Sequence, residues 1–219
     1  MSIADNIATV ESRIAAACAR AGRTREDVTL IAVSKTLPPD AVSEAIAAGI
    51  REIGENRVQE ARDKRPLVVG SARWHLIGHL QSNKAKDAAR LFDVIQTVDS
   101  VSLAERISAA AQTSGRAIEV LLEVNIGREP QKHGVAPEEV GNIVDRLRTL
   151  AGIHVNGLMA IPPVGEPDQT RAHFAELRKM RASVGLEHLS MGMSSDFEEA
   201  IEEGSTMIRV GRAIFGSRA

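Results

Sequence analysis

The chain has 219 residues, of which 43% are hydrophobic and 26% charged, a composition typical of a folded globular protein rather than a disordered one. Its formal net charge of −2 gives no electrostatic reason to expect a nucleic-acid or membrane partner, and no stretch approaches the roughly 20 apolar residues of a membrane span. The single cysteine, Cys18, excludes an internal disulfide, and no tyrosine is present to act as an acid or base. We therefore expect a cytoplasmic protein without a signal peptide.

Helical and strand patterns alternate along the whole chain. The first helix is predicted over Ser2–Ala21, where isoleucine and valine side chains recur at spacings of three and four residues. Eight short apolar runs then predict strands over Val28–Val33, Ile50–Ile53, Trp74–Ile77, Val94–Val98, Ile118–Val124, Ile153–Met159, His188–Leu189 and Met207–Val210. The stretches that follow them predict helices over Asp40–Ala48, Arg57–Lys64, Ser82–Leu91, Leu103–Gln112, Pro137–Leu150, Asp168–Val184, Phe197–Glu203 and Arg212–Phe215.

This alternation determines the expected fold. Strands that alternate with helices form right-handed βαβ units around a parallel sheet, and eight such units close naturally into a barrel. We therefore predict a (β/α)8 TIM barrel with one extra N-terminal helix, formed as a single domain over residues 1–219. An open, doubly wound sheet is the alternative, and the absence of a Gly-rich dinucleotide-binding turn argues against it.

The loop predicted over Ser190–Asp196 is a candidate anion site. Small and hydroxyl residues follow the seventh strand there and precede a helix, and backbone N–H groups at such a position bind anions. Gly211 then opens the last helix directly after strand eight, and barrels often bind phosphate between the loops after strands seven and eight. The two features together favour phosphate, whereas Ser194 and Ser195 alone are equally consistent with a helix cap.

Lys35 follows the first strand, at the end of the barrel where active sites lie. Partial burial would lower the pKa of its amine from about 10.4, and a neutral amine is what imine formation with an aldehyde requires. Taken alone, Lys35 is more simply a solvated lysine at the end of a strand. Together with a phosphate site at the same end, it matches what pyridoxal 5′-phosphate (PLP) needs.

Arg209 is a charged residue within the apolar eighth strand, so it requires a partner. One interpretation is a buried ion pair with a carboxylate such as Glu123 of the fifth strand. The other is a hydrogen bond to a pyridine nitrogen. A guanidinium that is always protonated would keep that nitrogen unprotonated, which makes the ring a weak electron sink.

The six histidines show no spacing typical of a metal site, and His75 and His79 lie across a junction between a strand and a loop. We therefore expect no metal ligands in this chain.

Several segments together resemble the pyridoxal phosphate homeostasis proteins, single-domain relatives of the alanine racemase N-terminal barrel. The matching segments lie in order along nearly the whole chain: Ala32-Val33-Ser34-Lys35, Gly54-Glu55-Asn56-Arg57-Val58-Gln59-Glu60, Trp74-His75-Leu76-Ile77-Gly78, Leu80-Gln81-Ser82-Asn83-Lys84, Gly157-Leu158-Met159, Leu189-Ser190-Met191-Gly192-Met193-Ser194 and Arg209-Val210-Gly211. Any one of these segments alone would be weak, and their combination is specific.

The resemblance implies that Lys35 carries PLP as an internal aldimine (a Schiff base) and that Arg209 contacts the pyridine nitrogen. The family's positions around the phosphate are matched by Ser190, Gly192, Met193, Ser194 and Gly211. The positions that line the cofactor are matched by Asn56 and Met159. It also implies a role in PLP (vitamin B6) homeostasis without a committed reaction and hence without catalytic residues. Apo PLP-dependent enzymes are possible partners, and a monomer is expected.

Two enzymatic alternatives remain. An amino-acid racemase of the alanine racemase type would share the barrel, but those enzymes use a tyrosine from a partner subunit's β-domain, and this chain has no tyrosine and only about ten residues after strand eight. A Schiff-base aldolase acting on a sugar phosphate would share the lysine and the anion site, but it would leave Arg209 without a task.

Overall fold

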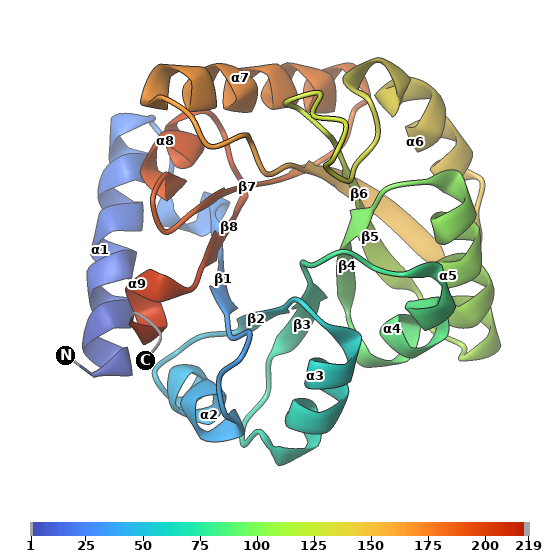
Figure 1. Cartoon of the computed structure of the whole chain (residues 1–219). Helices are drawn as coiled ribbons and strands as arrows, with labels where there is room; N and C mark the ends of the chain where they lie inside the picture. The colour runs from blue at the N-terminus through green and yellow to red at the C-terminus, as the bar shows by residue number, and fades with distance from the viewer. Residues whose placement is uncertain (1, 217–219) are drawn as a thin grey trace.

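Neighbouring strands pair in parallel in chain order, and the eighth strand pairs back with the first. Ala32, for example, lies opposite Ile53 on one side and opposite Val210 on the other. The computed structural model describes residues 2–216, and within them these pairings close a barrel with helices around it (Figure 1). The predicted (β/α)8 TIM barrel is therefore confirmed.

The barrel strands are short and lie close to the predicted runs. They are β1 Thr29–Val33, β2 Glu52–Glu55, β3 Arg73–Leu76, β4 Val94–Val98, β5 Ile118–Glu123, β6 Ile153–Met159, β7 His188–Met193 and β8 Met207–Val210. Their carboxyl ends meet at one end of the barrel, here called the mouth, where (β/α)8 proteins place their active sites.

The helices lie outside the strands, one after each strand, with one more at the beginning of the chain (Figure 1). They are α1 Ile3–Arg20, α2 Pro39–Ala47, α3 Val58–Lys64, α4 Ala85–Leu91, α5 Val101–Thr113, α6 Val140–Arg148, α7 Pro167–Ser183, α8 Phe197–Glu202 and α9 Arg212–Phe215. The predicted extra helix is thus present as α1, which packs against α8 and α9. None of the helices between residues 2 and 216 is long and apolar enough to cross a lipid bilayer.

The beginning of α1 shows how the sequence sets an element boundary. Ser2 accepts a hydrogen bond from the backbone N–H of Asp5, and the Asp5 carboxylate accepts one from the N–H of Ser2 in return. This capping box satisfies two N–H groups that a helix leaves unpaired. The predicted stripe lies on the inner face: Ile7, Val10 and Ile14 are buried.

Two strands differ from the prediction by more than one residue at a boundary, and the other six agree to within one residue. The second strand is displaced toward the C-terminus, because the buried carboxylate of Glu55 has hydrogen-bond partners and the strand continues through it. The seventh strand was predicted to end at Leu189 but continues to Met193. The expected loop over Ser190–Asp196 is therefore wrong in its first four residues, which are strand.

The core has two apolar compartments. The larger one lies mainly between the strands and the surrounding helices. A smaller one comprises five buried side chains of β1, β4, β5, β6 and β8: Ile31, Val94, Leu121, Met159 and Met207. Side chains of a strand point alternately to its two faces, so this second set fills the inside of the barrel. Buried polar residues lie beside this set in the sheet: Arg209 is opposite Ile31, His75 opposite Val94, and Ser190 opposite Met159.

Candidate functional site

A cavity of about 480 Å³ opens at the mouth of the barrel, among the ends of β1, β2 and β8, the loop after β7 and the helix α9. Six of the predicted site residues line it: Lys35, Asn56, Met193, Ser194, Arg209 and Gly211. They are far apart in the sequence, and the closure of the barrel brings them together. An amine, a guanidinium and a hydroxyl group thereby share one concave surface, which is the usual form of a small-molecule site.

Lys35 is half-buried and follows β1 with one residue, Ser34, between them, and its backbone is held from both sides. The carbonyl of Ser34 accepts a hydrogen bond from Lys64 Nζ at 2.8 Å. The backbone N–H of Thr36, a residue with the left-handed φ of 66°, donates to the Glu60 carboxylate. Lys64 and Glu60 are themselves an ion pair at 2.9 Å. The base of the Lys35 side chain is therefore fixed by contacts that do not involve its amine.

This support extends to a buried ion pair. Lys64 Nζ lies 2.6 Å from Glu55 Oε1, and the two side chains are 5% and 0% exposed. Ser34 Oγ donates to the same oxygen at 2.6 Å. Burial raises the pKa of the Glu55 carboxyl, while the hydrogen bonds from Lys64 and Ser34 act in the opposite direction. An ion pair that is buried this completely is stable only where its geometry is good, because both charges have lost their contact with water.

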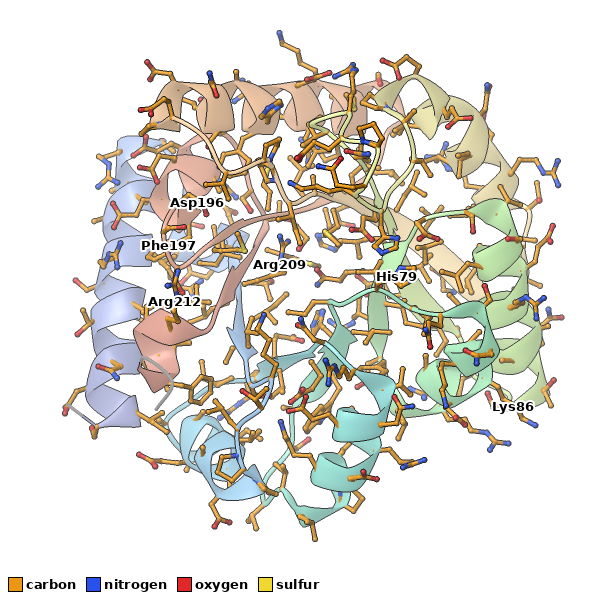
Figure 2. All side chains as sticks on the ribbon, viewed as in Figure 1. His79, Lys86, Asp196, Phe197, Arg209 and Arg212 are labelled. Carbon is orange, nitrogen blue, oxygen red and sulfur yellow. The ribbon has the colours of Figure 1, made fainter. Side chains whose placement is uncertain are left out.

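Arg209 of β8 is 4% exposed and lies near the middle of the ring of strands (Figure 2). It donates hydrogen bonds to Ser190 Oγ at 2.6 Å and to the carbonyl of Ala160 at 3.0 Å. Burial lowers the pKa of the guanidinium to about 10, so it remains a cation at neutral pH. Among the described residues Arg209 forms no direct salt bridge with Glu123, which answers the first interpretation of this arginine.

Glu123 nevertheless acts on Arg209 at longer range. Its negative charge favours the protonated guanidinium and so partly offsets the effect of burial. Burial, and secondly the charge of Asp99, raise the pKa of Glu123 itself to about 7. Its Oε2 atom is buried and has no hydrogen-bond partner among the described residues. The Glu123 carboxyl therefore takes up a proton at a higher pH than an ordinary carboxyl does.

A chain of hydrogen bonds continues from Arg209 into the barrel. Ser190 Oγ, which accepts from Arg209, donates to Gln96 Oε1 at 2.6 Å. Gln96 Nε2 lies 2.9 Å from Nδ1 of His75. Because an amide NH2 only donates, Nδ1 must accept, and the His75 proton is placed on Nε2, which lies 2.6 Å from Glu52 Oε2. Every donor in the chain thus points away from the mouth.

The other side of the cavity carries the predicted anion-binding residues. Ser194 and Ser195 lie in the short segment between β7 and α8, and Arg212 begins α9 directly after Gly211. Ser194 Oγ accepts a hydrogen bond from the N–H of Ala213 at 3.5 Å, which joins the two segments. The cavity wall there therefore offers hydroxyl groups, a cation and the beginning of a helix, all of which favour an anion.

Three of the predicted residues support the cavity from behind. Ser190 is buried beneath Arg209, and Met159 belongs to the apolar filling of the barrel. Gly192 has a left-handed φ of 93°, and a Cβ atom there would lie 2.5 Å from Cβ of Ala200 on α8. Only glycine fits this position without movement of the helix. Gly192 therefore allows the chain to turn tightly from β7 toward Ser194.

Some residues that line the cavity were not predicted. Arg212 and Ser195 supply polar groups, while Ile161 and Phe215 supply apolar surface. The position of Arg212, next to Gly211 and at the start of a helix after strand eight, was a signal that could have revealed it. Ile161 and Phe215 carry no such signal, because apolar residues at the ends of elements are common.

Comparison with known proteins agrees with this geometry. A family model described as the N-terminal domain of alanine racemase matches residues 6–219. A pyridoxal phosphate homeostasis protein of Pseudomonas aeruginosa is 43% identical over 221 residues, which cover 99% of this chain and 96% of that protein. The chain belongs to the family of pyridoxal phosphate homeostasis proteins.

Solved structures place this family member among its relatives. PipY of Synechococcus elongatus, solved without PLP, is 40% identical and covers 98% of this chain and 100% of its own, with a TM-score of 0.90. The same protein was solved with PLP bound, and that structure matches with a TM-score of 0.88. An alanine racemase of Clostridium difficile, 16% identical with a TM-score of 0.74, covers 98% of this chain and 57% of its own, and shows the fold alone.

Proposed function

We propose that this protein binds PLP in the mouth cavity and acts in PLP homeostasis. The observation that carries the proposal is that one cavity of about 480 Å³ has Lys35, Arg209 and Ser194 on its wall. PLP has three groups to satisfy: an aldehyde, a ring nitrogen and a phosphate. An amine, a fixed hydrogen-bond donor and an anion-binding segment are the matching partners.

Each partner has a role in this proposal. Lys35 would hold the aldehyde carbon through its amine, and Arg209 would donate a hydrogen bond to the ring nitrogen. Ser194, Gly211 and Arg212 would hold the phosphate, and Asn56 and Met193 would line the ring. When bound, PLP supplies an electrophilic aldehyde and an aromatic ring that can accept electrons.

We infer further that the protein carries PLP rather than turning over a committed substrate. Arg209 stays protonated and already donates two hydrogen bonds within the barrel, so it cannot protonate a ring nitrogen at neutral pH. The chain also contains no tyrosine, the residue that a racemase of the alanine racemase type needs opposite its lysine. We propose that one domain over residues 1–219 acts as a monomer and passes PLP to apo-enzymes.

The test is a labelling experiment on the full chain. PLP added to the protein should give a yellow product with visible absorption, and borohydride reduction should fix its mass on the peptide that contains Lys35. Lys35→Ala should lose both signals and remain folded. Lys179→Ala, which removes an exposed lysine of α7, should retain both. Labelling of another lysine, or a yellow Lys35→Ala protein, would overturn the assignment of Lys35.

A second experiment separates the carrier from the enzyme. Loaded protein should activate an apo PLP-dependent enzyme faster than free PLP does at the same concentration. Alanine racemisation at about 1 s⁻¹ or more, the lower end of the usual enzymatic range, would favour the racemase instead.

A further inference from the structure

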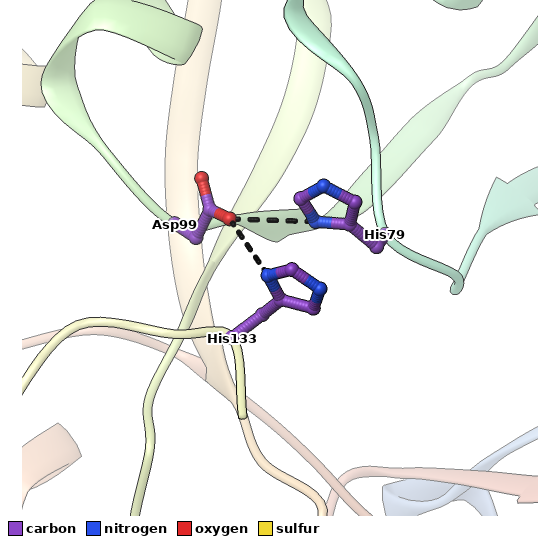
Figure 3. A group of neighbouring side chains, drawn as sticks. All are labelled: His79, Asp99 and His133. Atoms are coloured by element: carbon purple, nitrogen blue, oxygen red, sulfur yellow. Dashed lines mark ion pairs between the residues drawn. The ribbon is translucent and has the colours of Figure 1, made fainter. Parts of the chain in front are cut away.

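A second polar cluster lies at the mouth of the barrel, on loops after three consecutive strands. His79 follows β3, Asp99 directly follows β4, and His133 lies in the long loop after β5. The three side chains converge in space, as Figure 3 shows. They come from positions that are 20 and 34 residues apart in the sequence, and for this reason their spacing gave no indication of a site.

The potential ligand atoms of this His79–Asp99–His133 cluster lie close to one another. Nδ1 of His79 lies 3.5 Å from Asp99 Oδ2, and Nδ1 of His133 lies 3.9 Å from the same oxygen. The three potential ligand atoms all lie within 4.8 Å of one another. Both N···O separations exceed the 2.7–3.2 Å of an N–H···O hydrogen bond. A tetrahedral ion with bonds of about 2.0–2.1 Å would hold its ligand atoms about 3.3 Å apart, so the three side chains have to draw closer together to bind one.

The two imidazole rings lie face to face. The imidazoles of His79 and His133 are stacked, with centroids 3.6 Å apart and planes inclined by 10°. Because the lone pair of an imidazole nitrogen lies in the plane of its ring, two parallel rings cannot both direct one at the same ion, so at least one ring has to rotate when the ion binds. Neutral imidazole is the form of histidine that binds metals.

His79 is held in place by its neighbours in the chain. Leu80 is buried, and the carbonyl of Gly78 accepts a hydrogen bond from Thr97 Oγ1 at 2.9 Å. A Cβ atom at residue 78 would lie 2.3 Å from the carbonyl oxygen of Asn56, so the glycine allows two loops to pack tightly. The backbone on both sides of the His79 ring is therefore fixed.

The loop that carries His133 is fastened back onto β5. Val135 forms a bridge with Val124, and its N–H donates to the carbonyl of Glu123 at 2.8 Å. Within the loop, Asn125 exchanges side-chain hydrogen bonds with the backbone of Glu129 at 2.8 and 3.1 Å. This segment is thus an ordered arm that brings His133 to Asp99.

We propose that His79, Asp99 and His133 bind a first-row divalent transition-metal ion of the Zn²⁺ class. Two imidazoles and one carboxylate suit such an ion, whereas Mg²⁺ and Ca²⁺ prefer oxygen ligands throughout. Three protein ligands leave a coordination position for water or a further donor. The two histidines are 38% and 55% exposed, so that position is open to solvent. The site replaces our expectation of no metal ligands, and it does not depend on the proposed PLP binding.

Zn²⁺ binding to the chelator-treated full chain tests the proposal. Calorimetry and metal analysis after dialysis should give one tightly bound ion per chain. Binding should weaken by about 10–100-fold or more in each of His79→Ala, His133→Ala and Asp99→Asn, because loss of even a residue that only hydrogen-bonds a metal ligand has an effect of that size. His154→Ala removes an exposed histidine at the opposite end of β6 and should leave the affinity unchanged. Lys35→Ala should also bind Zn²⁺ normally, which separates this site from the cofactor site.

Thermal unfolding supplies a second measurement. Zn²⁺ should raise the Tm of the wild-type chain, because a ligand that binds only the folded state stabilises it, and it should not raise the Tm of the three cluster variants. Absence of a stoichiometric ion, or Zn²⁺ binding that all three cluster variants retain at wild-type affinity, would overturn the proposal. If Asp99→Asn fails to fold, the two histidine variants decide, since both rings lie at the surface.

Discussion

Lys64 Nζ lies 2.6 Å from Glu55 Oε1 in a buried ion pair, and the same ammonium donates to the carbonyl of Ser34, the residue before Lys35. The pair thus connects the interior of the barrel with the backbone that carries the amine of the site. A charge pair in this position acts as a positioning device, since neither Lys64 nor Glu55 lines the cavity.

Lys64→Met should destabilise the fold strongly. It leaves the Glu55 carboxylate buried without its cation, which lowers the free energy of unfolding by about 3–5 kcal/mol. Urea denaturation measures the change, and Lys86→Met on the exposed side of α4 is the control, expected to change stability by no more than about 0.5 kcal/mol. The double variant Lys64→Met/Glu55→Leu should recover part of the loss. Equal effects of Lys64→Met and Lys86→Met would contradict this role.

Ser190→Ala should weaken the chain of hydrogen bonds that supports Arg209. The hydroxyl accepts from Arg209 and donates to Gln96, so its removal leaves two buried polar groups without that partner. We expect the free energy of unfolding to fall by about 2–4 kcal/mol, measured by denaturation, and PLP binding to weaken, measured by titration. Ser183→Ala, at an exposed serine of α7, should change neither quantity appreciably. If Ser190→Ala changes neither stability nor PLP binding, water or Gln96 must supply the missing hydrogen bonds.

Gly192→Ala should be more harmful than an ordinary glycine substitution. The new alanine would have to keep the left-handed φ of 93°, and its Cβ atom would lie 2.5 Å from Cβ of Ala200. Backbone strain and overpacking should together lower the free energy of unfolding by about 2–5 kcal/mol. Gly115 also has a left-handed φ, of 63°, but a Cβ atom there meets nothing within 4 Å. Gly115→Ala should therefore cost only about 1–2 kcal/mol. Similar Tm losses for the two variants would exclude the contact with α8 as the cause.

The pH dependence of stability should show the titration of Glu123. Its pKa is raised to about 7 in the folded chain, above the unfolded value of about 4.3. Between these two pH values the unfolded chain releases the proton of Glu123 more readily than the folded chain does, so the free energy of unfolding falls as pH rises. Above the folded pKa this contribution no longer changes. Glu123→Gln should therefore gain stability over the wild type between about pH 4.3 and 7, on the order of 2–3 kcal/mol.

The measurement is denaturation in chelator-containing buffer at several pH values. A difference between Glu123→Gln and the wild type that stays constant from pH 4 to 8 would show that the Glu123 carboxyl has an ordinary pKa.

The local sequence determined the architecture. Alternating apolar runs and amphipathic stretches predict eight βα units, and the positions of Lys35 and Arg209 relative to their strands place both at the mouth. These features are local, because burial of a strand or of a helix face is written in the periodicity of that segment alone. The predicted end of β7 was wrong for the same reason: Ser190 and Gly192 interrupt the apolar run, yet hydrogen bonds to distant residues keep Ser190 buried within the strand.

Only the tertiary structure decided which polar groups meet. Lys64 is the last residue of α3, and its ammonium meets the Glu55 carboxylate at the end of β2. His79 and His133 become neighbours through the closure of the barrel and the fold of the loop after β5. Periodicity records how deeply each residue is buried and not which distant residue it faces, so partners contributed by different strands are fixed only when the barrel closes.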